Sequence, residues 1–418
     1  MIVTVHILLI SAIVWIIFRK TSTSPIRRHY FTALVLKLSA GIILGVIYFN
    51  HYKSGDTLIF HETAVKVIQL SSRSDAEYLS FLVHGPDEML KETNPVLNEP
   101  RSAFFIRFLS ILYLLTSSNY WLTGVYLSLL SFSGAWILTN TIIKCDQGMK
   151  LPALAGLLYL PTFVFWTSGV LKESMAWFCI AMLIGYFLDY KRDRYISVWR
   201  IVATIVMIYV LWNIKYYYMA VLVLCLGPLW LYVFLQNQYK KNLQFYFVYI
   251  GAILFIGTIL TFLHPNFSPA RILNLIHENH LIMLDRSAPG HAIRFFKAED
   301  PFLNFIINIP VSLSGGLFMP LLWQGVNFFA RVTGLINTVL LVFFIVKLIE
   351  VFRSGHHPIS ILGISVAIYI VVLAILLAYT TPNFGTLERY KTSYIAFFTL
   401  WVLYKNPLFM RIFRTGKH

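Results

Sequence analysis

Charged residues are scarce in this chain, and acidic residues are the scarcest of them. Only 12% of the 418 residues are charged, with 18 Asp and Glu against 34 Lys and Arg, while 58% are hydrophobic. A soluble domain of this length could not bury so much apolar surface, so the composition predicts a polytopic membrane protein. The net charge of +16 lies in short basic clusters between apolar runs, a pattern that sets membrane topology and does not indicate nucleic acid.

Cysteine is also rare, and the usual signatures of soluble enzymes are missing. Cys145, Cys179 and Cys225 lie in or beside apolar runs and form no disulfide or metal framework. The sequence contains no phosphate-binding glycine loop, serine nucleophile elbow or Cys/His nucleophile signature. Its histidines in the polar segments show no recognised metal spacing. We therefore assign no metal ligands and no cofactor, and binding of a divalent cation is left as an open alternative.

Apolar runs that are long enough to cross ~30 Å of hydrocarbon recur about eleven times along the chain. We therefore predict an all-α fold, a polytopic transmembrane helix bundle that forms a single integral membrane domain over residues 1–418. The predicted spans lie near residues 2–18, 31–52, 119–143, 151–170, 174–190, 200–214, 218–236, 245–263, 326–350, 359–379 and 390–404.

Alternate connections between these runs are rich in Lys and Arg, which places them in the cytoplasm by the positive-inside rule. The first run has basic residues after it and none before it, which predicts an uncleaved membrane anchor with its N-terminus on the outer side. The C-terminus is predicted to be cytoplasmic. The basic set comprises Arg19, Lys20, Arg27, Arg28, Lys144, Lys150, Lys191, Arg192, Arg194, Arg200, Lys240, Lys241, Arg353, Lys405, Arg411, Arg414 and Lys417.

The opposite, outer side carries two long segments, 53–118 and 264–325. Each contains an apolar stretch, 104–118 or 302–325, that would break the alternation if it spanned the membrane by itself. We predict that both stretches are interfacial or re-entrant helices, since proline and glycine interrupt the second one. A polar stripe of Glu62, Lys66 and Gln69 also predicts a helix lying on the outer membrane surface.

Charged residues gather where predicted spans meet the outer side. Ionisable residues at membrane depth are energetically costly, which favours a functional role. Each also has a structural reading: Asp56 as a helix cap, the charged turns as local pairs, and the long basic side chains as interfacial anchors. The candidates are Asp56, His61, Glu62, Arg107, Lys172, Glu173, Lys215, Glu388, Arg389 and Lys391.

Two groups of residues resemble a known family. Asp56, Phe60 and Ala64 fit a D-x-x-x-[YF]-x-x-x-A setting after an early span, which looks like the first outer loop of the GT-C glycosyltransferases. The stretches "PTFVFWTSGVLKES" and "GTLERYK" are similar to segments of bacterial membrane proteins grouped near those transferases. This chain differs by an additional span before the loop and by Thr57 where many members carry a second acid, which leaves metal dependence open.

The resemblance implies a sugar transfer from a polyprenyl-phosphate-linked donor to a glycan or lipid acceptor of the cell envelope. Asp56 would be the general base, and Lys172, Lys215, Arg389, Lys391 and Arg107 would stabilise the departing phosphate. Glu173 and Glu388 would orient those cations or bind sugar hydroxyls, and His61 and Glu62 complete the candidate substrate site. The expected location is the bacterial cytoplasmic (inner) membrane, with the active site facing the periplasm or exterior and the lipid tail among membrane lipids.

Other functions fit parts of the same pattern. A polysaccharide polymerase or ligase would share the outer loops and the outer cations, because both of its substrates are lipid-linked saccharides. A lipid-linked-sugar flippase or transporter is expected to show inverted repeats and charges at the bilayer midplane, whereas these charges gather at one surface. A noncatalytic assembly subunit is a further alternative, but it would not explain the charged residues on the outer side.

Overall fold

The computed structural model describes residues 2–71, 74–235, 244–354 and 360–414. The chain is 84% helical, and the described residues form no strand; Ala292 and Asn383 make an isolated antiparallel bridge. The all-α prediction is therefore confirmed. The predicted basic residues Lys240, Lys241 and Lys417 lie outside the described residues.

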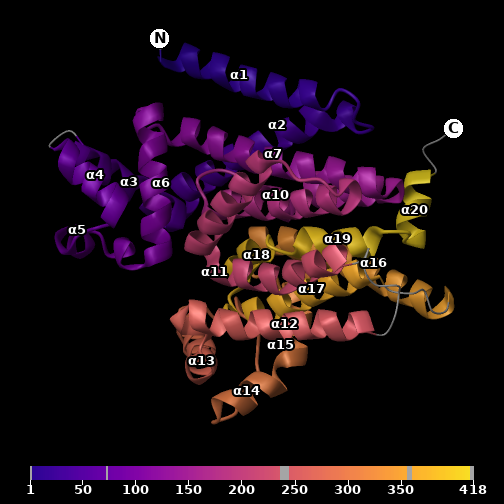
Figure 1. Cartoon of the computed structure of the whole chain (residues 1–418). Helices are drawn as coiled ribbons and strands as arrows, with labels where there is room; N and C mark the ends of the chain where they lie inside the picture. The colour runs from indigo at the N-terminus through magenta and orange to yellow at the C-terminus, as the bar shows by residue number, and fades with distance from the viewer. Residues whose placement is uncertain (1, 72–73, 236–243, 355–359, 415–418) are drawn as a thin grey trace.

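Long helices run side by side in a bundle, with the helices of residues 56–116 gathered at one of its ends and the short α20 at the other (Figure 1). The N-terminal helix α1 (Ile2–Lys20) lies on the outside of the bundle, and its His6 bonds both Tyr126 and the carbonyl of Leu115. The other long helices are α2 (Tyr30–Ile47), α7 (Tyr120–Cys145), α10 (Lys172–Asp193), α11 (Val198–Leu235), α12 (Gln244–Leu263), α16 (Phe328–Ser354) and α17 (Ile361–Thr380).

Among the described residues, five helical segments are long and apolar enough to cross a membrane. They are Arg27–Tyr52, Tyr120–Cys145, Val198–Phe234, Phe328–Ser354 and Ile361–Thr380, and the bent pair α14 (Pro301–Ile307) and α15 (Ile309–Phe318) makes a sixth if it counts as one span. Several apolar helices can therefore span a membrane, but the predicted eleven spans are not confirmed.

Two of the predicted spans are broken into short helices. The run 151–170 divides into α8 (Lys150–Ala153), the π-helix η5 (Leu154–Tyr159) and α9 (Pro161–Trp166). The break falls at Pro161, whose ring removes a backbone donor and disfavours helix in the residue before it. The last run contains only the nine-residue α19 (Ile395–Leu403), which follows α18 (Phe384–Lys391) and precedes α20 (Pro407–Arg414).

Helix α11 turns back on itself at Lys215, whose φ of −148° and ψ of 67° are not helical. Arg200, near its start, forms an ion pair at 3.2 Å with the last turns of α10, and the carbonyl of Val233, near its end, accepts a hydrogen bond from the residue after α10. Lys215 lies instead 3.2 Å from Glu173, at the start of α10. The predicted runs 200–214 and 218–236 are thus two arms that meet at Lys215.

The first long polar segment folds into four helices at one end of the bundle (Figure 1): α3 (Asp56–Ser71), α4 (Asp75–His84), α5 (Glu88–Thr93) and α6 (Pro100–Thr116). The side chains of Ser74 and Asp87 accept hydrogen bonds from the first turns of α4 and α5, which fixes where these helices begin. Helix α6 lies across the direction of the long helices (Figure 1). This orientation supports the prediction that 104–118 is interfacial.

The second long polar segment contains α13 (Pro269–Asp285) and a bent helix pair. Helices α14 and α15 meet at an angle of 54°. After α15 the chain runs back along α16, where Leu322 N donates to Thr338 Oγ1 at 3.0 Å and Asn337 donates to the carbonyl of Pro320 at 3.1 Å. His291 before the pair and Asn327 after it line the same pocket. The bent pair fits either a broken span or a re-entrant loop, so the re-entrant stretch stays a prediction.

The contact between α15 and α17 depends on the absence of a side chain at Gly316. A Cβ atom there would lie 2.3 Å from the carbonyl oxygen of Ala374 in α17, and backbone cannot move aside easily. At Gly185 in α10, by contrast, a Cβ atom would meet nothing within 4 Å.

We predict that Gly316→Ala destabilises the protein by about 1–3 kcal/mol, because it overpacks a helix contact. Gly185→Ala is the matched control and is expected to be neutral or slightly stabilising, since alanine favours helix. The measurement is the temperature at which the detergent-solubilised protein loses its monodisperse peak in size-exclusion chromatography. Equal midpoints for the two variants would contradict the close packing of α15 on α17.

Candidate active site

Asp56 stands at the first residue of α3, directly after a sharp turn of the backbone. The π-helix η2 (Tyr48–Tyr52) ends α2, and Lys53 and Gly55 both have positive φ, 53° and 118°. Glycine suits the second position because a Cβ atom there would lie 2.6 Å from the ring of Tyr48. This turn brings the Asp56 carboxylate to Arg389, 333 residues further along the chain, whose Nη1 donates to Asp56 Oδ2 at 2.6 Å.

A buried carboxylate links this pair to two further segments. Glu173 Oε1 lies 3.2 Å from Lys215 Nζ and 3.4 Å from Arg389 Nε, and the side chain of Glu173 is only 3% exposed. The contact with Arg389 Nε is an ion pair without a hydrogen bond. Helices α3, α10, α11 and α18 therefore meet through four charged side chains, and all four are among the candidates predicted from the sequence.

The network continues into α6 through residues that the sequence analysis did not single out. Lys172 Nζ donates to Ser102 Oγ at 2.9 Å and lies 3.6 Å from Glu99 Oε2, while Ser102 Oγ donates to that same oxygen at 2.5 Å. Arg101 pairs with Glu99 as well. The sequence signal was the run of charges in "NEPRS" just before the apolar stretch of α6.

Aromatic rings cover the cations on their remaining sides. Lys215 Nζ lies 3.8 Å from the centre of the Tyr390 ring, and the Arg101 guanidinium lies 5.8 Å from that of Tyr216 and 6.0 Å from that of Tyr217. Such contacts stabilise a desolvated cation by about 2 kcal/mol. Tyr390 has no sequence signal beyond its place between Arg389 and Lys391.

Positive charge exceeds negative charge by one in this network. The cations are Arg101, Lys172, Lys215 and Arg389, and the carboxylates are Asp56, Glu99 and Glu173. Burial alone would raise the pKa of Asp56, but the guanidinium of Arg389 outweighs it and holds that pKa below its ordinary value. Burial would likewise raise the pKa of Glu99, and Lys172 and Arg101 lower it. The site thus has an unbalanced positive charge beside ionised carboxylates.

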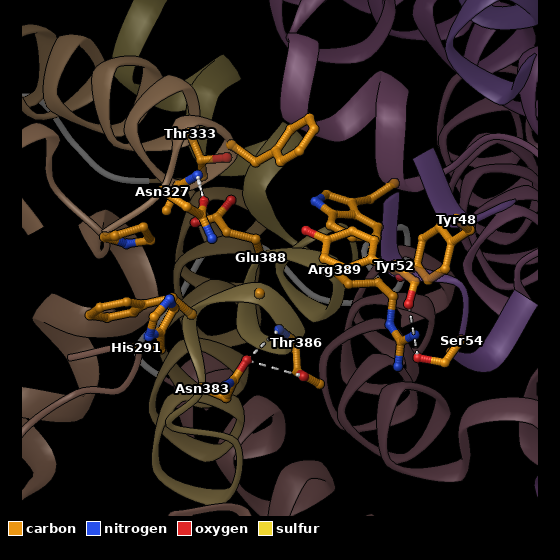
Figure 2. Close-up of a pocket in the computed structure, with 17 residues that line it drawn as sticks. Tyr48, Tyr52, Ser54, His291, Asn327, Thr333, Asn383, Thr386, Glu388 and Arg389 are labelled. Carbon is orange, nitrogen blue, oxygen red and sulfur yellow. Dashed lines mark hydrogen bonds between the residues drawn. The ribbon is translucent and has the colours of Figure 1, made fainter. Parts of the chain in front are cut away.

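A pocket of about 470 Å³ opens beside the Asp56–Arg389 pair. Arg389 lies on the side of Tyr48, Tyr52 and Ser54, and Glu388 on the side of Asn327 and Thr333 (Figure 2). The other lining residues are Gly55, Trp166, His291, Pro320, Phe329, Ala330, Asn383, Phe384, Gly385 and Thr386. Of the predicted site residues, Glu388 and Arg389 form part of this lining, while Lys172, Glu173 and Lys215 are buried behind it.

The remaining candidates lie apart from the charged network. Lys391 is fully buried and donates to Glu388 at 2.6 Å and to the carbonyl of Met319 at 2.5 Å. Arg107 donates to the carbonyl of Leu82 at 3.3 Å, which ties α6 to the end of α4. His61 bonds the hydroxyl of Tyr113 at 2.6 Å, and Glu62 is exposed on α3.

Nothing in the described residues assembles a metal centre, since no group of three or more His, Cys, Asp or Glu side chains could hold an ion there. Comparisons with protein-family models, curated proteins and solved structures found no match to the chain. The resemblance to the GT-C transferases therefore stays a prediction, and the geometry of the site is what bears on function.

We predict that Glu173→Gln destabilises the protein by about 3 kcal/mol or more, because it removes the buried carboxylate that Lys215 and Arg389 share. The matched control is Glu62→Gln on exposed α3, which is expected to change stability by less than about 0.5 kcal/mol. Thermal unfolding of both variants in detergent, followed by intrinsic fluorescence, measures the difference. A Glu173→Gln midpoint equal to that of the control would mean that the two cations are not held by this carboxylate.

Proposed function

We propose that the protein is an integral-membrane glycosyltransferase that moves a sugar from a polyprenyl-phosphate-linked donor to a cell-envelope acceptor, with Asp56 as general base. One observation carries the proposal: charged residues from α3, α10, α11 and α18 meet beside a pocket at one end of an apolar helix bundle. In this proposal an anionic headgroup occupies the pocket while its lipid tail stays in the bilayer.

The charge of the network favours an anionic donor. One positive charge is left over after the carboxylates are counted, and Arg389 is the cation that lines the pocket. A guanidinium can hold a phosphate through two parallel hydrogen bonds. Fixed cations in a water-poor site also stabilise the negative charge that develops on a departing phosphate.

Asp56 is suited to receive the proton of an acceptor hydroxyl. Its side chain is 42% exposed, whereas that of Arg389 is only 12% exposed. Asp56 itself is not part of the pocket lining, but it follows the lining residue Gly55 and is bonded to the lining residue Arg389. In the proposed step the hydroxyl loses its proton to Asp56, and its oxygen bonds to the anomeric carbon. The bond from that carbon to the phosphate oxygen breaks, and the electron pair leaves with the phosphate. When a donor phosphate binds Arg389, the ion pair that depresses the pKa of Asp56 weakens, and Asp56 becomes a better base.

The buried members of the network position Arg389. Glu173 lies behind Arg389 and in turn contacts Lys215, and both are 4% exposed or less. Neither of them lines the pocket, so they do not contact a substrate bound there. Their role in the proposal is to keep the guanidinium aimed at the pocket, which is how a preorganised site lowers a barrier.

The proposed location is the bacterial cytoplasmic membrane, with the pocket facing outward. Lys144, at the end of α7, and Arg192, at the end of α10, lie at the ends of those helices away from the charged network. Basic residues favour the cytoplasmic side. This orientation leaves the N-terminus outside and the C-terminus in the cytoplasm.

We predict that Asp56→Asn lowers sugar transfer by about 10²- to 10⁴-fold, the usual contribution of a general base. The assay is the envelope glycan of a host deletion strain that carries the wild-type gene or a variant, with protein levels matched by immunoblot. Glu62→Gln, six residues further along α3, is the control and should restore the glycan fully. Full restoration by Asp56→Asn would remove Asp56 as base.

The same strains separate transfer from polymerisation. A transferase defect shortens each glycan unit by one sugar, whereas a polymerase or ligase defect leaves complete single units that are not joined or attached. Mass spectrometry of the lipid-linked saccharides distinguishes these products. Accumulation of complete units in the deletion strain would replace the transferase proposal with the polymerase one.

A further inference from the structure

Glu388 is held in the pocket wall by one of its two carboxylate oxygens. Oε1 accepts hydrogen bonds from Lys391 Nζ at 2.6 Å and from Asn337 Nδ2 at 2.8 Å. Lys391 is fully buried and is itself fixed by the carbonyl of Met319. The side chain of Glu388 is 5% exposed, and it lines the pocket. Within the part of the chain that the structure describes, no group donates to Oε2.

The surroundings of Glu388 differ from those of Arg389, its neighbour in sequence. Asn327, Thr333 and Asn383 contribute amide and hydroxyl groups to the pocket, and Trp166 and Phe329 contribute aromatic rings. Among the described residues, Glu388 is the one acidic side chain in the pocket lining. Arg389 is the one lysine or arginine side chain in it. Most of the pocket is therefore neutral, and Glu388 is its charged hydrogen-bond acceptor.

This chemistry selects a ligand with hydroxyl groups and no charge of its own at the Glu388 end. A carboxylate accepts hydrogen bonds from two neighbouring hydroxyls well, aromatic faces pack against the C–H side of a sugar ring, and amides bond the remaining hydroxyls. A second carboxylate at the same place would be repelled by Glu388 and would lose its water without gaining a partner. The volume of about 470 Å³ is ample for one sugar ring.

We infer that the pocket holds the glycosyl group of the donor as an uncharged pyranose, with Glu388 accepting hydrogen bonds from its hydroxyls and Arg389 bound to its phosphate. This inference rests on the proposed function and adds the substrate class: a neutral hexose, not a uronic acid. Lys391 and Asn337 are positioning residues, because they touch Glu388 and not the pocket.

Binding measurements on the purified full chain in detergent micelles test the inference without turnover. The probes are decaprenyl phosphate and its conjugates with glucose, galactose, mannose, N-acetylglucosamine and glucuronate. For the wild type, at least one neutral conjugate should bind about tenfold more tightly than decaprenyl phosphate, as expected for hydrogen bonds to a charged acceptor. The glucuronate conjugate should bind no more tightly than decaprenyl phosphate.

The matched variant is Glu388→Gln combined with Lys391→Met, because Glu388→Gln alone would leave a buried lysine unpaired. It should bind decaprenyl phosphate like the wild type, which also shows that it is folded, and it should lose the tenfold gain from the sugar. A gain that persists in this variant, or an equal gain from glucuronate, would overturn the inference. If the wild type binds decaprenyl phosphate but gains nothing from any neutral sugar, this inference alone fails; if it binds no decaprenyl phosphate, the proposed function fails with it.

Discussion

Glu173 carries a negative charge inside an apolar helix bundle, and much of the site depends on how that charge is neutralised. A buried carboxylate without partners would be several kcal/mol too costly to keep. Lys215 and Arg389 both lie within 3.4 Å of Glu173 Oε1. Because Lys215 is the corner of α11 and Arg389 belongs to α18, this one oxygen fixes two distant segments at the start of α10. The pocket wall is built on that junction.

Helix α18 divides the site into two kinds of chemistry. Successive residues of a helix point about 100° apart, whereas residues three apart share a face. Glu388 and Lys391 therefore point together toward α15 and α16, where Asn337 and the Met319 carbonyl receive them. Arg389 points toward α3 and α10 instead. Glu388 and Arg389 are adjacent in sequence and opposite in charge, yet they line separate ends of one pocket and form no ion pair with each other.

The sequence predicted the convergence of Asp56, Lys172, Glu173, Lys215 and Arg389 because helix ends on one side of a bundle share a level. It could not predict which cation meets which acid, since that depends on how α6 lies across the bundle. Glu99 and Arg101 joined the network for this reason. The eleven predicted spans are not confirmed, and one reason is visible at Pro161, which breaks an apolar run whose composition alone looks continuous.

Lys391 and Arg107 show a second limit of sequence reasoning. Both were candidates for a phosphate, with a structural role as the alternative. In the structure Arg107 donates to the carbonyl of Leu82, in the last turns of α4, and Lys391 donates to Glu388 and to the carbonyl of Met319, where α15 ends. Composition cannot distinguish such a cation from a ligand-binding one, because the partner is a backbone group created by the fold.

Arg389 has one exposed ion-pair partner and one buried partner, and this asymmetry bears on mechanism. Asp56 is 42% exposed, whereas Glu173 is 3% exposed. An anion that enters the pocket can compete with Asp56 for the guanidinium, but it cannot reach Glu173. In the proposed mechanism, binding of the anion and release of Asp56 from its ion pair are one event, while Glu173 keeps Arg389 in place. Asp56 would then become more basic when the anionic substrate binds and would be a weak base without it.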